Sequence, residues 1–140
     1  ALPVIRYRTR DLTRLLPPTA RSMRRMGKIV GRSDDMLIIR GVNVFPTQIE
    51  EIVLAEPKLS GQYQILVSRD GHLDEVEVRC ELQPEAARTP QAEVDGIARE
   101  VQHRIKTLVG VSTRVSIGQP NSLERTLVGK ARRVIDRRPK

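Results

Sequence analysis

The chain has 140 residues, a length that suits one modest domain or one domain with a segment of another. Its net charge of +8 is unevenly distributed: residues 1–33 carry +8, residues 34–124 carry −6 and residues 125–140 carry +6. A nucleic-acid-binding domain is expected to spread a basic face over its fold and to offer aromatic side chains to single strands. Only three residues are aromatic, so composition disfavours that class. Two basic clusters around an acidic body suit a cleft for a polyphosphate better.

Cysteine and hydropathy patterns limit the cellular setting. Cys80 is the single cysteine, which excludes an internal disulfide and fits a reducing compartment. No run approaches the roughly 18 apolar residues of a membrane span, and no signal peptide precedes the first strand-like segment. We therefore expect a cytoplasmic protein without a membrane partner. The sequence starts at Ala1 within a strand-like segment, so we expect a piece of a longer chain. His72 and His103 lack ligand-spaced partners, so no metal centre is expected.

The first half of the chain changes character near residue 34. Residues 1–33 are predicted to form short extended pieces without a face to bury. Two short apolar runs, residues 36–39 and 42–45, flank Arg40-Gly41 and predict a hairpin. A helix is expected over residues 47–55, where Thr47 and Glu50 have the spacing of a capping box.

The second half alternates strands and a long helix. Apolar residues alternate around residues 63–67 and 76–82, with a turn at Asp70-Gly71 between them. The longest helix is expected to start at Thr89-Pro90, with proline at its first position, and to be capped by Gly110. A last strand follows over residues 111–117, and the tail from Gln119 is polar and basic. The predicted fold class is α+β: a small antiparallel sheet with two helices on one face.

Three motifs stand in order along nearly the whole chain. They are Tyr7-Arg8-Thr9-Arg10-Asp11-Leu12-Thr13, Arg40-Gly41-Val42-Asn43-Val44-Phe45-Pro46-Thr47-Gln48-Ile49-Glu50 and Gly129-Lys130-Ala131-Arg132-Arg133-Val134. Together they resemble the phenylacetate–CoA ligase family of adenylate-forming enzymes. The resemblance implies that residues 1–33 are the last segment of a large ATP-binding domain and residues 34–140 a mobile C-terminal domain.

The resemblance also implies a two-step reaction. An aryl-acetic acid such as phenylacetate, ATP and magnesium give an acyl adenylate and pyrophosphate, and CoA then gives the thioester and AMP. The acid pocket, the phosphate-gripping loop and the magnesium ligand are expected upstream of Ala1. The isolated chain should then be inactive, and the intact enzyme is a candidate homodimer.

The resemblance assigns roles to six residues. Lys130 is the expected catalytic residue: both reacting partners are anions, and a flexible ammonium suits a transient bridge between carboxylate and α-phosphate. Asp11 and Arg32 are expected to bind the ribose of ATP. Asp34 is the favoured hinge, with Asp35 as the alternative. The last pair, Arg40 and Gly41, is expected to line the tunnel for the pantetheine arm of CoA, where a missing side chain admits a thin substrate.

Each assignment has a plainer alternative. Lys130 can be a solvated lysine in a basic tail, Asp11 a turn aspartate, Arg32 a linker charge and Gly41 an ordinary hairpin glycine. The neighbouring Arg132 and Arg133 can meet CoA phosphates or be solvated. For the chain as a whole, the open alternatives are a ligase for another aromatic acid or an amino acid, and a non-catalytic α+β ligand-binding module.

Overall fold

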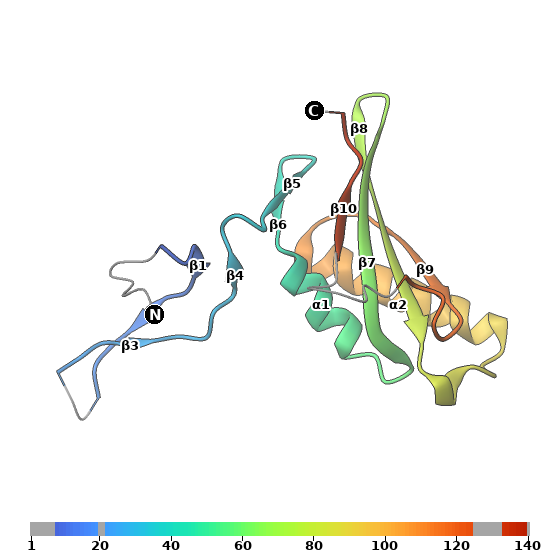
Figure 1. Ribbon diagram of the computed structural model, residues 1–140, viewed down its shortest axis with the longest axis horizontal. Coiled ribbons are helices and arrows are strands. Elements are labelled where there is room, and N and C mark those ends of the chain that lie inside the picture. Colours follow the sequence, from blue (N-terminus) through green and yellow to red (C-terminus); the bar gives the residue numbers. More distant parts are fainter. Residues whose placement is uncertain (1–7, 20–21, 125–132, 140) are drawn as a thin grey trace, which may run out of the picture.

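The structure is a computed structural model that describes residues 8–19, 22–124 and 133–139. An extended N-terminal arm leads into a layered α+β unit (Figure 1). Lys130 and the rest of the segment 125–132 lie outside the described residues.

The N-terminal arm consists of two small antiparallel pairs. Strand β1 (Asp11–Leu12) pairs with β4 (Gly31–Arg32), and β2 (Leu15–Leu16) pairs with β3 (Arg25–Met26). The arm leaves large apolar side chains exposed, Met23 at 74% among them. It therefore has no core of its own, as its sequence predicts.

The main sheet has four strands in the order β10-β7-β8-β9. The two long central strands, β7 (Leu59–Asp70) and β8 (Leu73–Leu82), are antiparallel and joined by a turn in which Gly71 has φ 58°. Strand β9 (Arg114–Gly118) runs parallel to β8, and β10 (Val134–Asp136) runs parallel to β7. The expected purely antiparallel sheet is therefore corrected to a mixed sheet. A helix lies between β8 and β9 in the chain and makes the crossover that parallel pairing needs.

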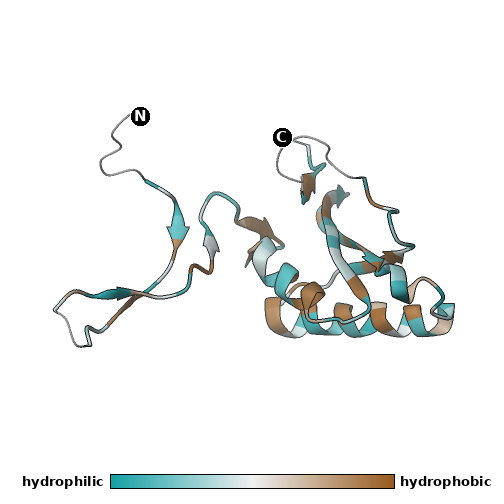
Figure 2. Cartoon of the chain, turned by 60° about the horizontal axis from the view of Figure 1, so that its bottom comes forward, coloured by the Kyte–Doolittle hydropathy of each residue, from teal (hydrophilic) through white to brown (hydrophobic). Residues whose placement is uncertain are grey.

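Two helices cover one face of this sheet. Helix α1 (Pro46–Leu54) packs against β7, and α2 (Gln91–Val109) packs against β9 and α1; a 3₁₀ turn (Pro84–Ala86) precedes α2. Figure 2 shows both helices on the same side of the strands. This arrangement confirms the α+β class with two helices on one face. Gly110 ends α2 with φ 83° and donates its N–H to the Lys106 carbonyl at 3.1 Å, as predicted.

The core lies between the sheet and the helices. Alternate residues of β7 and β8 face the helices and are fully buried, among them Ile65, Val67 and Val78 at 0% exposure. Burial of one such side chain contributes roughly 1.5–3 kcal/mol. Residues between them point to the other face of the sheet, which neither described helix covers. Ile39 and Val44, which precede α1, also belong to this core, whereas the arm adds little to it.

The start of α1 differs from the predicted capping box. Phe45 is the N-cap residue and Pro46 the first helical residue, so the helix begins one residue earlier than expected. The Phe45 N–H donates to Gln48 Oε1 at 3.1 Å. The Thr47 hydroxyl donates instead to the Val30 carbonyl at 2.8 Å, which joins the arm to the helix start. The predicted pairing of Thr47 with Glu50 is therefore wrong.

The hairpin at Arg40-Gly41 is confirmed. Strand β5 (Leu37–Ile39) pairs with β6 (Val42–Val44) across a two-residue turn. Arg40 has φ 50° and Gly41 has φ 79°, the left-handed values of a type I′ turn. Such a turn matches the twist of the strands, and glycine adopts its second position without steric cost.

Candidate functional site

Two expected nucleotide-binding residues lie side by side at the junction of the arm and the α+β unit. Asp11 and Arg32 are directly opposite each other in the β1–β4 ladder. The pairing extends beyond the strands, because the Ser33 N–H donates to the Arg10 carbonyl at 2.8 Å. The structure therefore brings together two residues that are 21 positions apart in sequence.

The expected hinge carboxylate is engaged with Arg32. Arg32 donates from Nε to Asp34 Oδ1 at 3.0 Å and from Nη2 to Asp34 Oδ2 at 2.7 Å. Arg10 approaches the same carboxylate at 3.8 Å. Desolvation opposes the effect, but the hydrogen bond from Arg32 and the charge of Arg10 hold the pKa of the Asp34 carboxyl below its usual range. No such ion pair involves Asp35 among the described residues, so Asp34 is the more constrained of the two hinge candidates.

A cleft of about 480 Å³ opens beside this junction. Its walls come from β4, from the turn after it, from the start of α1 and from the edge of the main sheet. Gly31 lies in its wall against the helix start: a Cβ there would meet the Phe45 ring at 3.3 Å and the Thr47 hydroxyl at 3.4 Å. The close approach of backbone to helix is possible because Gly31 has no side chain.

Arg133 lines the same cleft and, although its side chain is 44% exposed, it has defined partners. Its guanidinium pairs with Glu50 on α1, lies 5.0 Å from the centroid of the Tyr63 ring and donates to the Tyr63 hydroxyl at 3.3 Å. Its carbonyl accepts from the Ile65 N–H at 2.7 Å. The sequence leaves Arg133 between contact with CoA phosphates and solvation, and it does not indicate these contacts. The partners are up to 83 positions apart, so no local pattern announces them.

Arg133 is the first described residue after the segment 125–132, which contains Lys130. Its carbonyl contacts β7 and its side chain contacts α1.

The predicted tunnel residues lie elsewhere. Neither Arg40 nor Gly41 lines the cleft; both form the turn of the β5–β6 hairpin. Arg40 donates from Nε to the Asp74 carbonyl at 2.7 Å, which fixes the turn beside β8. Among the described residues, and apart from its two chain neighbours, no heavy atom lies within 4 Å of a Cβ built on Gly41, so the space beside it is open.

Two features are absent from the described residues. No helix there is both long and apolar enough to cross a membrane. No group of three or more His, Cys, Asp or Glu side chains in that part of the chain has a metal-binding arrangement.

Comparison with known proteins gives the family. The sequence profile of the AMP-binding enzyme C-terminal domain matches residues 41–138, well over half of the chain. The chain belongs to this family. Strand β6, both helices and the four-stranded sheet lie within the matched range, whereas β5 precedes it.

The AMP-binding C-terminal domain has similar relatives among ligases. The chain is 61% identical to the phenylacetate-coenzyme A ligase of Aromatoleum evansii over its whole length, and it spans 32% of that enzyme. It matches a solved domain of a phenylacetate-coenzyme A ligase from Bacteroides vulgatus with a TM-score of 0.68 and 32% identity; the match covers 76% of this chain and 95% of the domain.

A third relative has been solved with its ligands. A 2-hydroxyisobutyryl-CoA ligase with a bound acyl-AMP, in its postadenylation state, matches with a TM-score of 0.77 and 33% identity, over 91% of this chain and 28% of that one. The same ligase has also been solved with its acyl-AMP and CoA in the thioesterification state. These structures show an acyl-AMP and CoA bound to that ligase.

Proposed function

We propose that this chain is the C-terminal domain of an AMP-forming acid–CoA ligase that acts on phenylacetate or a related aryl acid. The observation that supports this most is the shared cleft. Arg32 and Asp34 at the arm junction line it together with Arg133, the residue that follows the Lys130 segment. The relatives named above support the ligase class, and the chain spans only about a third of the length of the phenylacetate-coenzyme A ligase.

In the first half-reaction Lys130 is proposed to bridge the two reacting anions. The acid carboxylate attacks the α-phosphate of ATP, a carboxylate–phosphate bond forms and pyrophosphate leaves. A positive charge directed at the α-phosphate lowers the barrier, because it stabilises the negative charge of the transition state and offsets the repulsion between carboxylate and phosphate. Magnesium is proposed to accompany ATP, with its ligands outside this chain.

Asp11 and Arg32 are proposed to bind the ribose. A carboxylate can accept hydrogen bonds from two neighbouring hydroxyls. Arg32 uses Nε and Nη2 on Asp34, so its Nη1 remains for another acceptor. The Arg32–Asp34 ion pair would couple nucleotide binding to the hinge, because movement at Asp34 would displace the guanidinium that binds the ribose.

The second half-reaction is proposed to use the hairpin. Movement about Asp34 would exchange the Lys130 segment for Arg40 and Gly41 beside the large domain. The CoA thiol, as thiolate, then attacks the acyl carbonyl, the thioester bond forms and AMP leaves. The open space around Gly41 is compatible with a narrow pantetheine arm at the turn.

A ligase for another aromatic acid is the nearest alternative, since the acid pocket is proposed to lie outside this chain. The test uses the full-length protein that carries the chain, in acid-dependent exchange of pyrophosphate into ATP. We expect phenylacetate to support exchange better than benzoate, 2-hydroxyisobutyrate or phenylalanine. Pyrophosphate exchange with none of these acids would contradict the proposal, and a preference for another acid would correct the substrate.

Gel filtration of the same full-length protein tests the predicted homodimer.

A further inference from the structure

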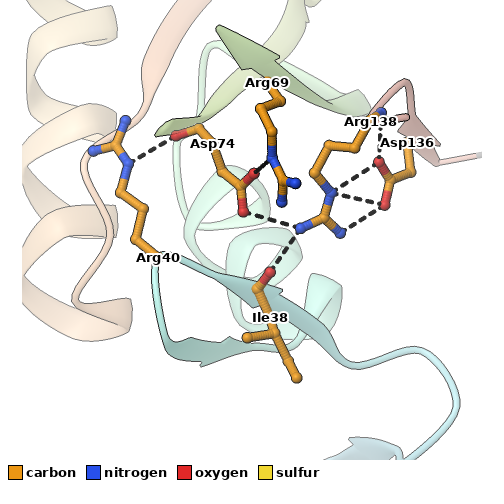
Figure 3. Close-up of polar contacts among 6 residues, drawn as sticks. All are labelled: Ile38, Arg40, Arg69, Asp74, Asp136 and Arg138. Atoms are coloured by element: carbon orange, nitrogen blue, oxygen red, sulfur yellow. Dashed lines mark hydrogen bonds and ion pairs between the residues drawn. The ribbon is translucent and has the colours of Figure 1, made fainter. Parts of the chain in front are cut away.

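A cluster of ion pairs around the buried carboxylate Asp74 lies outside the cleft. Asp74, near the start of β8, is 8% exposed and accepts from Arg69 Nε at 2.8 Å and from Arg138 Nη1 at 3.0 Å (Figure 3). Arg138 also forks onto Asp136, with Nη2 to Oδ2 at 2.7 Å. None of these four residues lines the cleft described above.

The cluster reaches the hairpin at two points. Arg138 Nη1 donates to the Ile38 carbonyl on β5 at 2.8 Å, and Arg40 Nε donates to the Asp74 carbonyl at 2.7 Å (Figure 3). Asp74 thus stands between the two contacts. Its side chain holds Arg138, and its backbone holds the turn.

The Ile38 carbonyl is available because of the turn type. In a two-residue hairpin Ile39 and Val42 form the hydrogen-bonded pair next to the turn, so Ile38 and Asn43 form the following non-hydrogen-bonded pair. The Ile38 carbonyl therefore points away from β6, toward the open edge of β5. Arg138 occupies that edge. The hairpin is also held by its buried side chains, Ile39 and Val44, so Arg138 adds a polar anchor at the edge that these apolar contacts leave open.

Arg138 suits this task better than lysine would. Its guanidinium donates to the Asp136 carboxylate from Nε and Nη2, and to the Asp74 carboxylate and the Ile38 carbonyl from Nη1. A planar group with five N–H donors can make these contacts at the same time, whereas an ammonium has three donors at one point. Its side chain is only 19% exposed, so the ion pairs are less screened than those on the surface.

We propose that Arg138 is a positioning residue for the CoA half-reaction: with Asp74 it fixes the hairpin that presents Arg40 and Gly41. The role in CoA transfer rests on the proposed function, whereas the anchoring of the hairpin does not. Because β10 carries Asp136 just before Arg138, the cluster also ties the hairpin to the strand that follows the Lys130 segment.

The first test is hydrogen exchange in the full-length protein, read by mass spectrometry on peptides covering residues 36–45. We expect Arg138→Ala to speed exchange there by about tenfold, while α2 peptides stay unchanged. Arg138→Lys should give a smaller increase and also serves if Arg138→Ala does not fold. The matched control is Arg99→Ala, which removes an exposed arginine from α2 and should leave the hairpin unchanged.

The second test separates the two half-reactions in the same variants. We expect kcat/KM for CoA, measured from supplied acyl adenylate, to fall about ten- to a hundredfold in Arg138→Ala, with pyrophosphate exchange within twofold of wild type. An unchanged hydrogen-exchange rate in peptides covering residues 36–45 would overturn the inference. An equal loss of activity in both half-reactions would also overturn it. If wild type catalyses neither half-reaction the proposed function fails, and faster hydrogen exchange would still support the anchoring.

Discussion

At the scale of single residues, burial decides the chemistry of Cys80. The side chain is 1% exposed on the helix-facing side of β8, and desolvation raises the pKa of its thiol to about 12. We predict that Ellman's reagent does not modify Cys80 in the folded protein at pH 8 but reacts with one thiol per chain in denaturant. Rapid, stoichiometric reaction of the folded protein would contradict this placement. The raised pKa also means that the contribution of Cys80 to stability is present below about pH 9 and is lost as pH rises toward 12.

Variants of Gly41 distinguish two reasons for a glycine at this position: the backbone conformation of the turn and the space that a substrate needs. Its φ of 79° is unfavourable for residues with a Cβ, so Gly41→Ala should lower the free energy of unfolding by about 1–2 kcal/mol. Asparagine tolerates this conformation better, so Gly41→Asn should recover most of that loss in a thermal or urea melt. The two variants thus separate the backbone from the space beside it.

The same variants test the tunnel. If a pantetheine arm passes Gly41, Gly41→Asn should be stable yet slow in the CoA half-reaction, by at least tenfold, with pyrophosphate exchange retained. Wild-type CoA transfer in Gly41→Asn would show that Gly41 serves the turn alone.

At the scale of elements, local patterns predict most of the fold. The hairpin, both helices and the two long strands follow from alternation, helical periodicity and turn residues, all of which act within a few positions. The capping box at Thr47 fails because Pro46 begins the helix one residue earlier and the Thr47 hydroxyl has a partner in the arm, 17 positions away.

The parts that sequence missed depend on distant partners. Strand β10 has three residues in a basic tail and forms because the edge of β7 is available to it. Arg138 and Asp74 are 64 positions apart. For the candidate site, the sequence suggested Asp11, Arg32 and Asp34 through the family resemblance. Their proximity and the pairing of Arg133 with Glu50 became visible only in the structure.

The cluster at the hairpin makes the stability of these elements sensitive to acid. The hydrogen bond from Arg69, opposed by desolvation and reinforced by Arg138, holds the pKa of the Asp74 carboxyl below its usual range. The pairing therefore stabilises the fold above the unfolded pKa of about 3.9, and the effect is lost as pH falls through the lower folded pKa. We predict that Asp74→Asn lowers Tm most above about pH 5 and progressively less below pH 4.

The control for this pH dependence is Asp95→Asn, on the exposed face of α2. It should change Tm little at any pH. A Tm difference for Asp74→Asn that stays constant from pH 7 to pH 3 would mean that the carboxylate is not stabilised by Arg69 and Arg138.

At the scale of the whole molecule, the chain holds only part of the proposed catalytic apparatus. Residues 1–140 alone are predicted to form no phenylacetyl-CoA from phenylacetate, ATP, magnesium and CoA, because most ATP contacts are proposed to come from the large domain. The full-length protein in the same assay is the positive control. Thioester formation by the isolated chain would show that this unit is catalytically complete.

The most direct test of the account is Lys130→Ala in the full-length protein, with Lys106→Ala on the exposed face of α2 as the matched control. Loss of one preorganised charge should lower phenylacetate-dependent pyrophosphate exchange by about 10²–10³. Thioester formation from supplied phenylacetyl-adenylate and CoA should stay near wild type, because that step is proposed to use the hairpin. Lys106→Ala should change neither half-reaction. Pyrophosphate exchange at the wild-type rate in Lys130→Ala would contradict the central claim that this chain supplies the adenylation lysine.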